Sequence, residues 1–183
     1  MTRPKELRSE IDALSLGVSG ADLEKSRKKV AALEPATGLT PVEGPGLRVT
    51  LTDAPDAGKD PDIDPNIQIV HQQDIQAYVN ALWAGGAEAM SLQGQRLMTT
   101  TGIVCVGNVV ILDGVPYSPP YVIEAIGNVA GMEQAMAKSP DTISYARYSQ
   151  DYQLGLEIEQ LAQVKVKAYG NPVSLAHATI PSS

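Results

Sequence analysis

The stretch Gly102-Ile-Val-Cys-Val-Gly-Asn-Val-Val-Ile-Leu-Asp-Gly-Val-Pro-Tyr117 decides the fold class of this 183-residue chain. It contains three short runs rich in β-branched residues, separated by the dipeptides Gly107-Asn108 and Asp113-Gly114. Such two-residue connections favour the tight turns of β-hairpins, because their residues tolerate a positive φ. Consecutive hairpins build antiparallel strands, so the stretch disfavours a purely parallel, doubly wound sheet.

Helix signals flank this meander on both sides. Upstream, residues 71–84 carry apolar side chains at the i, i+3, i+4, i+7 spacing of an amphipathic helix, with Asp74 in its first turn. Downstream, Asn128 can cap a helix that runs to about Lys138. Ser139-Pro140 then has the residue types of a second helix N-terminus.

The remaining elements are strands that complete an α+β domain. The segments with strand character are residues 47–52, 87–97 and 121–126, followed by a closing hairpin of residues 154–158 and 163–168. The order of strands and helices predicts a two-layer sandwich with the helices on one face of the sheet. Its simplest form is an elaborated ferredoxin-like βαββαβ sheet.

Outside this domain, which we expect to span residues 47–169, the chain divides into three segments. Residues 1–34 predict a coiled-coil-like helical stalk, because apolar residues repeat every seven positions. Residues 35–46 are rich in Pro and Gly and predict a linker, and residues 170–183 predict a tail. The thin heptad seam favours a homodimer through the N-terminal helix, and the alternative is a frayed helix that lies on its own domain.

The composition excludes several classes of protein. Apolar residues make up 43% and charged residues 19% of the chain, which is the usual globular mix. The formal net charge of −7 and the lack of a basic stripe exclude nucleic acid as a partner. A single cysteine excludes a disulfide framework. No apolar stretch approaches the roughly 20 residues of a membrane-spanning helix.

No catalytic or cofactor-binding constellation is visible. His71, at a helix start, and His177, in the tail, are the only histidines, and the sequence contains neither a G-x-S-x-G motif nor a phosphate-binding loop. Cys105 lies between two valines of an expected strand, so we interpret it as a buried structural thiol. The sequence therefore predicts a protein that is not an enzyme and holds no cofactor.

The acidic loop of residues 53–66 superficially resembles a calcium-binding loop. Asp60, Asp62 and Asp64 alternate as calcium ligands do, but Pro65 stands at the sixth position, where the sharp turn needs Gly. His71 stands at the twelfth position, where calcium loops have a bidentate Glu. We therefore interpret the loop as an acidic surface segment without a metal.

Arg96 is the first candidate for an interaction residue, followed by Glu88 and Tyr121. A guanidinium group can clamp an anion or a carboxylate of a partner. The alternative role for Arg96 is a salt bridge, either to Glu88, which lies eight residues earlier across an expected interruption at Gly94-Gln95, or to a residue of the acidic loop. Tyr121 follows Pro119-Pro120, which forms either an exposed recognition edge or a rigid corner between strands.

Four motifs together resemble one bacterial family. They are TPVEGPGLRVTL (residues 40–51), DIQAYVNALWAGGAEA (74–89), GQRL (94–97) and SPPYVIEAIG (118–127). In this order they are similar to the YlxW/YlxX-like family, the domain of unknown function 881, over residues 35–169.

The resemblance implies a single-pass membrane protein. In such a protein an N-terminal transmembrane helix precedes a stalk, and the α+β domain lies outside the cytoplasmic membrane. On this interpretation the chain represents the part after the anchor, with residues 7–33 as the stalk. The resemblance also implies a gene near cell-division genes, and it supplies no catalytic residues. Gln93 and Asn128 replace the family's usual Asn and Asp, so a site that needs the Asp charge is excluded.

Two functions compete at this point. The first is a non-enzymatic scaffold that self-associates through the stalk and docks cell-envelope proteins by a sheet edge or by the face around Arg96. The alternative is a module that senses a small anion near Arg96 and Tyr121. A hydrolase comes third, and it would require a polar pocket that brings His71 to Ser, Thr or Cys105.

Overall fold

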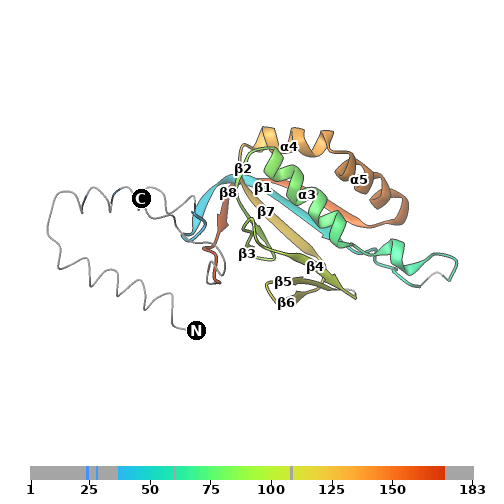
Figure 1. Ribbon diagram of the computed structural model, residues 1–183. Helices are drawn as coiled ribbons and strands as arrows, with labels where there is room; N and C mark the ends of the chain where they lie inside the picture. Colours follow the sequence, from blue (N-terminus) through green and yellow to red (C-terminus); the bar gives the residue numbers. More distant parts are fainter. Residues whose placement is uncertain (1–23, 25–27, 29–36, 60, 108, 172–183) are drawn as a thin grey trace, which may run out of the picture.

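The computed structural model describes residues 24, 28, 37–59, 61–107 and 109–171 (Figure 1). Of the expected stalk, it describes only Glu24 and Lys28, both of which are helical and exposed. The rest of the stalk, with its predicted pairing, lies outside the described residues, and so does the tail beyond Asn171.

An antiparallel sheet of five strands forms the centre of the domain. Its strands are β1 (Val42–Thr52), β2 (Ala87–Leu92), β3 (Gln95–Arg96), β7 (Tyr121–Gly127) and β8 (Gly155–Val166). They lie in the order β3-β2-β7-β1-β8, and each neighbouring pair is antiparallel. The predicted α+β class with antiparallel sheets is therefore confirmed.

Three α-helices cover one side of this sheet (Figure 1). They are α3 (Gln72–Ala84), α4 (Val129–Lys138) and α5 (Pro140–Tyr152), and a short 3-10 helix, η2 (Pro65–Gln68), precedes α3. The cap predicted for α4 is confirmed, because the side chain of Asn128 accepts a hydrogen bond from the Gly131 N–H at 3.1 Å. The expected stop of α3 is also present, at Gly85. No helix of the described part is long and apolar enough to cross a membrane.

The meander predicted for residues 102–117 forms a second, small sheet. Its strands are β4 (Ile103–Val106), β5 (Val109–Leu112) and β6 (Val115–Tyr117), paired in that order. The turn between β5 and β6 has φ of 47° at Asp113 and 84° at Gly114, as the dipeptide predicted. β4 lies beside α3, where the Gln72 side chain accepts a hydrogen bond from the Cys105 N–H at 3.0 Å.

The core lies between the large sheet and the helices. Leu47, Val49 and Leu51 of β1 are fully buried there. With no Phe in the chain, tyrosines supply the aromatic packing, and the rings of Tyr78 and Tyr145 meet edge to face at 5.7 Å. Two helices are therefore fixed to each other through the core.

The expected start of the first strand was wrong. β1 begins at Val42 rather than Leu47, so it includes the Gly44-Pro45-Gly46 segment that the sequence predicted to be linker. The pairing with β8 shifts register between Gly44 and Gly46, which leaves Pro45 in a bulge. A proline without an N–H is tolerated in a central strand at such a position.

The closing hairpin was also wrong. β8 is one continuous strand that pairs with β1 from Gly155 to Val166. Residues 159–162 contain no Gly, Pro, Asn or Asp that would favour a turn. The long partner strand β1 therefore extends β8 through the point where we expected a reversal.

Candidate functional site

Arg96 lies at the end of β3, a strand of two residues at the edge of the large sheet. β3 pairs with β2 so that Arg96 stands directly opposite Ser91. A tight turn at Gln93 and Gly94, both with positive φ, sets this register. Arg96 is only 6% exposed, although the sequence placed it on a docking face.

Arg96 is one of three described residues with a buried polar atom that lacks a hydrogen-bond partner. Arg96 Nη1, Ser91 Oγ and Thr40 Oγ1 are inaccessible to solvent and have no hydrogen-bond partner among the described residues. Ser91 is the cross-strand neighbour of Arg96. The backbone at Gly38, two residues before Thr40, packs so closely that a Cβ there would lie 3.7 Å from Arg96 Nε. The site thus combines a cation and the neighbouring Ser91 hydroxyl, and in the described part both have unmade hydrogen bonds.

Arg96 also lines a surface cavity of about 700 Å³, which we call the Arg96 cavity. One side of it is the outer face of α3, and the other is formed by β3 and the loop that follows. The residues that line it are Gly38, Gln76, Val79, Asn80, Trp83, Glu88, Arg96, Leu97, Met98, Thr99, Thr101 and Ile103. Its wall is mixed, with apolar side chains, two amides and one residue of each charge.

Glu88 and Arg96 share this cavity without forming the salt bridge considered above. Among the described residues no carboxylate lies within 4.0 Å of the Arg96 guanidinium, and Glu88 is exposed. Burial lowers the pKa of Arg96, but a guanidinium group remains protonated in proteins. Arg96 therefore lines the cavity with a guanidinium group that is largely buried and that no side chain of the described part neutralises.

Tyr121 is not part of this site. It is 1% exposed at the start of β7 and belongs to the core between the sheet and α3. Its hydroxyl donates a hydrogen bond to the Tyr117 carbonyl at 3.4 Å, and burial raises its pKa to about 12. This burial was not predictable from the local sequence, because Tyr121 follows two prolines, which are typical of an exposed corner.

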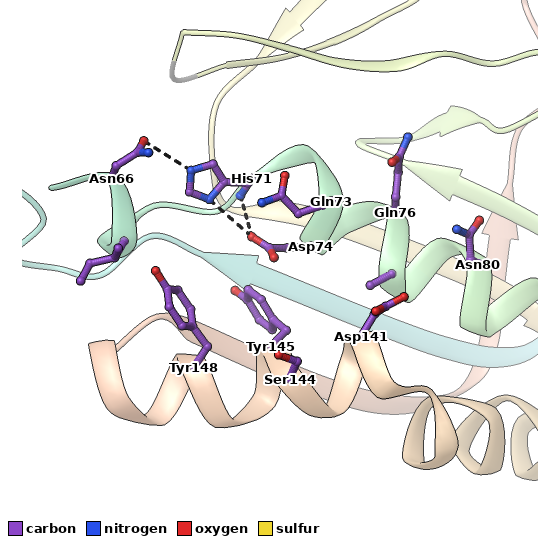
Figure 2. A pocket seen from close by; sticks show the side chains of 12 residues that line it. Asn66, His71, Gln73, Asp74, Gln76, Asn80, Asp141, Ser144, Tyr145 and Tyr148 are labelled. Carbon is purple, nitrogen blue, oxygen red and sulfur yellow. Dashed lines mark hydrogen bonds and ion pairs between the residues drawn. The ribbon is translucent and has the colours of Figure 1, made fainter. Parts of the chain in front are cut away.

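A second cavity of about 740 Å³ lies between α3 and α5 (Figure 2). We call it the Asp74 cavity. Asp74 Oδ2 accepts a hydrogen bond from the His71 N–H at 2.8 Å, which caps α3, and lies 3.7 Å from His71 Nδ1. His71 Nε2 lies 3.4 Å from Asn66 Oδ1. Ser144, Tyr145 and Tyr148 come from α5 on the opposite wall.

The electrostatics of this second cavity are dominated by carboxylates. Burial raises the pKa of Asp74, and the His71 N–H partly offsets that rise. Burial also raises the pKa of Tyr145 and Tyr148, and the charge of Asp74 adds to both shifts. Asp141 contributes a second carboxylate to the wall, and neither Lys nor Arg lines the cavity.

The Asp74 cavity does not assemble a hydrolase. His71 and Ser144 both line it, but no hydrogen bond joins them among the described residues, and Figure 2 shows Ser144 on the α5 side, away from the imidazole. The ring nitrogens of His71 face Asp74 and Asn66 instead. Cys105 lies on β4, where burial raises the pKa of its thiol. In the described part we therefore find no nucleophile–base pair.

The described part of the chain also shows no metal centre. It contains no group of three His, Cys, Asp or Glu side chains that could hold an ion. In the acidic loop, Asp53 and Asp64 instead accept hydrogen bonds from the Val70 and Asn66 N–H groups, at 2.8 and 2.9 Å. These two carboxylates therefore stabilise the loop and η2.

Sequence reasoning found Arg96 and Glu88 but missed most of their surroundings. Gln76 and Asn80 carry a weak signal, because two amides at i and i+4 form a polar stripe on a helix that is otherwise buried. Ser91 and Thr40 carry none. Ser91 lies opposite Arg96 only through strand pairing, and the chain before β1 approaches Arg96 at Gly38.

Fold and site together define a small α+β domain with an unpaired, buried arginine beside a surface cavity. The chain belongs to the family described as "Bacterial protein of unknown function (DUF881)", whose model matches residues 29–179. The resemblance noted from the motifs is thereby confirmed at the level of the family.

Relatives and a solved structure agree with this assignment. The UPF0749 protein Rv1823 of Mycobacterium tuberculosis (strain H37Rv) is 30% identical over 170 residues, which cover 85% of this chain and 53% of that protein. The UPF0749 protein YlxW of Bacillus subtilis (strain 168) is 40% identical over 91 residues, covering 50% and 38%. The chain thus spans about half or less of the curated relatives it matches.

A crystal structure of an uncharacterized conserved protein from Mycobacterium tuberculosis supports the fold. It superposes with a TM-score of 0.62 at 24% identity, and the match covers 84% of this chain and 99% of that one.

Proposed function

We propose that this chain is a non-catalytic interaction domain that recognises a carboxylate group of a protein partner at the Arg96 cavity. The observation that carries the proposal is the burial of Arg96 without a hydrogen bond or ion pair among the described residues. An unpaired buried charge costs several kcal/mol, roughly, so its retention in a native fold requires an explanation. We propose that a partner's carboxylate supplies it.

The charges around the site favour a carboxylate over a phosphate. Arg96 supplies one positive charge, and Glu88 on the same wall supplies a negative one. The whole chain carries a formal charge of −7. A dianionic phosphate would be repelled by this surrounding charge, whereas a monoanionic carboxylate is balanced by a single guanidinium group.

The architecture in which this site is embedded is part of the proposal. An elaborated ferredoxin-like topology is supported by the strand order β2-β7-β1-β8 and by the helical connections, which are α3 and the α4–α5 pair. From the heptad spacing we propose a homodimeric stalk in residues 1–34. From the family resemblance we propose a single-pass membrane protein whose domain faces away from the cytoplasm and acts as a scaffold for envelope proteins, with a link to cell division.

A second candidate function is sensing of a small free anion. The observation that favours it is the volume of the Arg96 cavity, about 700 Å³, which falls within the range of small-molecule sites. The sensor and the interaction domain use the same guanidinium group. They differ in whether the carboxylate belongs to a free metabolite or to a protein.

Side-chain NMR of the full chain tests carboxylate recognition directly. Titration with N-acetyl-leucine should shift the Arg96 Nε–H resonance, and titration with N-acetyl-leucine amide should not. Arg147→Gln is the matched control, because Arg147 is exposed on α5 and lines neither of the two cavities. An Arg96 resonance that ignores the acid, or responds equally to acid and amide, would overturn the proposal.

A further inference from the structure

The Arg96 cavity and the Asp74 cavity meet on α3. Gln76 and Asn80 line both of them, so the two hollows lie on either side of these two side chains. Neither side-chain amide has a hydrogen bond among the described residues, and each can both donate and accept. A ligand that fills both cavities would pass over the side-chain amides of Gln76 and Asn80. These amides can form hydrogen bonds with the N–H and C=O groups of a peptide backbone.

The two cavities have opposite electrostatic character. The Arg96 cavity contains an unpaired guanidinium group. The Asp74 cavity contains the carboxylates of Asp74 and Asp141 with the rings of Tyr145 and Tyr148, and its only other titratable residue is His71. Carboxylates beside aromatic rings, with neither Lys nor Arg in the wall, favour a cationic side chain.

Asp74 has an oxygen available for such a cation. Oδ2 is occupied by the His71 N–H that caps α3, whereas Oδ1 has no hydrogen bond among the described residues. The Asp74 side chain is 18% exposed, and Figure 2 shows its carboxylate group directed toward the space between α3 and α5. Burial of this charge makes an added cation more favourable there than on the open surface.

The rise of α3 between Asp74, which lines the Asp74 cavity, and Trp83, which lines the Arg96 cavity, gives the scale of the ligand. From Asp74 to Trp83 the helix axis rises about 14 Å at roughly 1.5 Å per residue. An extended peptide covers this distance with about four residues at roughly 3.3 Å each. Resting on the proposed function, we propose that the surface binds an extended peptide C-terminus: its carboxylate lies at Arg96, its backbone crosses Gln76 and Asn80, and a Lys or Arg about four residues earlier enters the Asp74 cavity.

A display experiment with free C-termini tests the proposal. The full 183-residue chain is immobilised and offered random octapeptides displayed either with a free C-terminal carboxylate or with both ends blocked. We expect enrichment only in the free-carboxylate library, with Lys or Arg concentrated three to five positions before the last residue. Amidation of a selected peptide should weaken binding about tenfold or more, as loss of a charge-assisted contact does.

Variants assign the two ends separately. Arg96→Gln should remove the need for a free carboxylate, with Arg147→Gln as its control. The double variant Asp74→Asn/Asp141→Asn should remove the preference for Lys or Arg while the carboxylate requirement persists. Asn at position 74 keeps an oxygen for the His71 N–H, and Asp151→Asn is the control on the exposed end of α5.

The outcomes separate this inference from the proposed function. Binding of internal Asp or Glu peptides that depends on Arg96 but shows no basic preference would overturn the inference and leave the proposed function standing. Selection of acidic residues upstream of the terminus would overturn it as well. A chain that enriches no peptide in either library would overturn both.

Discussion

Gly46 lies in β1, where it pairs with Ile126 of β7. A Cβ at this position would lie 1.9 Å from the Ala125 carbonyl oxygen, so the two central strands would have to separate. We expect Gly46→Ala to lower the free energy of unfolding by about 3 kcal/mol or more, which is typical of overpacking a rigid backbone contact. Urea denaturation measures this loss.

The matched control for Gly46 is Gly102→Ala. The nearest atom to a Cβ there is Val104 Cγ2 at 3.9 Å, an ordinary contact. We expect a change of about 0.5 kcal/mol or less, as for most surface substitutions. Equal losses at both positions would contradict the packing argument.

Arg96 gives a second prediction at the residue scale. Because its guanidinium group is buried and unpaired, Arg96→Met should raise the free energy of unfolding by roughly 1 kcal/mol while removing carboxylate recognition. Differential scanning calorimetry without ligand measures the first effect, and the NMR titration measures the second. A variant that gains binding, or that unfolds more easily, would contradict this trade-off.

Arg48 is the control for this exchange of Arg for Met. Its guanidinium group is paired with Glu124 at 2.9 Å and with Glu159 at 3.3 Å, on neighbouring strands. Arg48→Met should therefore lower stability slightly, by about 0.5 kcal/mol, because these pairs are largely solvated. We therefore expect the change in the free energy of unfolding to have opposite signs for Arg96→Met and Arg48→Met, because the first guanidinium group is unpaired and the second is paired.

At the scale of the element, α3 is capped by the carboxylate of Asp74, and burial of this group disfavours its charged form. Burial raises the pKa of Asp74 above its ordinary value of 3.8, so the folded state binds a proton more tightly than the unfolded state. This tighter proton binding stabilises the folded state fully below pH 3.8. The contribution is lost as the pH rises through the pKa that Asp74 has in the folded state. Asp74→Asn should therefore gain stability relative to the native chain as the pH is raised from acid to neutral.

Urea denaturation of both chains at several pH values measures this difference. Asp151→Asn, on the exposed end of α5, controls for the general loss of a negative charge. A difference between the native chain and Asp74→Asn that stays constant with pH would contradict the prediction.

Local elements were predictable from the sequence, and long-range geometry was not. The turn at Asp113-Gly114 and the cap at Asn128 depend on residues close together in the chain, whereas the turn at Gln93-Gly94 makes two strands of the segment that we expected to be one interrupted strand, residues 87–97. The bulge at Pro45 and the continuous β8 depend on pairing between β1 and a strand more than a hundred residues later. A local pattern contains no information about that partner.

The candidate site shows the same division. Arg96 stood out because a guanidinium group can clamp an anion, and Glu88 because it was a potential salt-bridge partner of Arg96. Their shared cavity also needs α3 and the backbone at Gly38, and the burial of Arg96 arises only when these segments meet. Tyr121 was assigned to the site because Pro119-Pro120 before it can form an exposed recognition edge. In the structure its ring is packed in the hydrophobic core.

At the scale of the whole molecule, the number of copies decides how the proposed site works. If residues 1–34 pair two chains, two Arg96 cavities are held together, and a partner with two C-termini binds more tightly than either cavity alone allows. We expect light scattering across a concentration series to give a dimeric mass for the full chain and a monomeric mass for a chain that starts at Pro35. The core residues of the α+β domain all lie beyond that point, so the shorter chain should retain its unfolding transition. Two equally monomeric chains would contradict the prediction that residues 1–34 form a dimer. Tighter binding of a bivalent partner would then require that a membrane surface, rather than residues 1–34, holds two chains together.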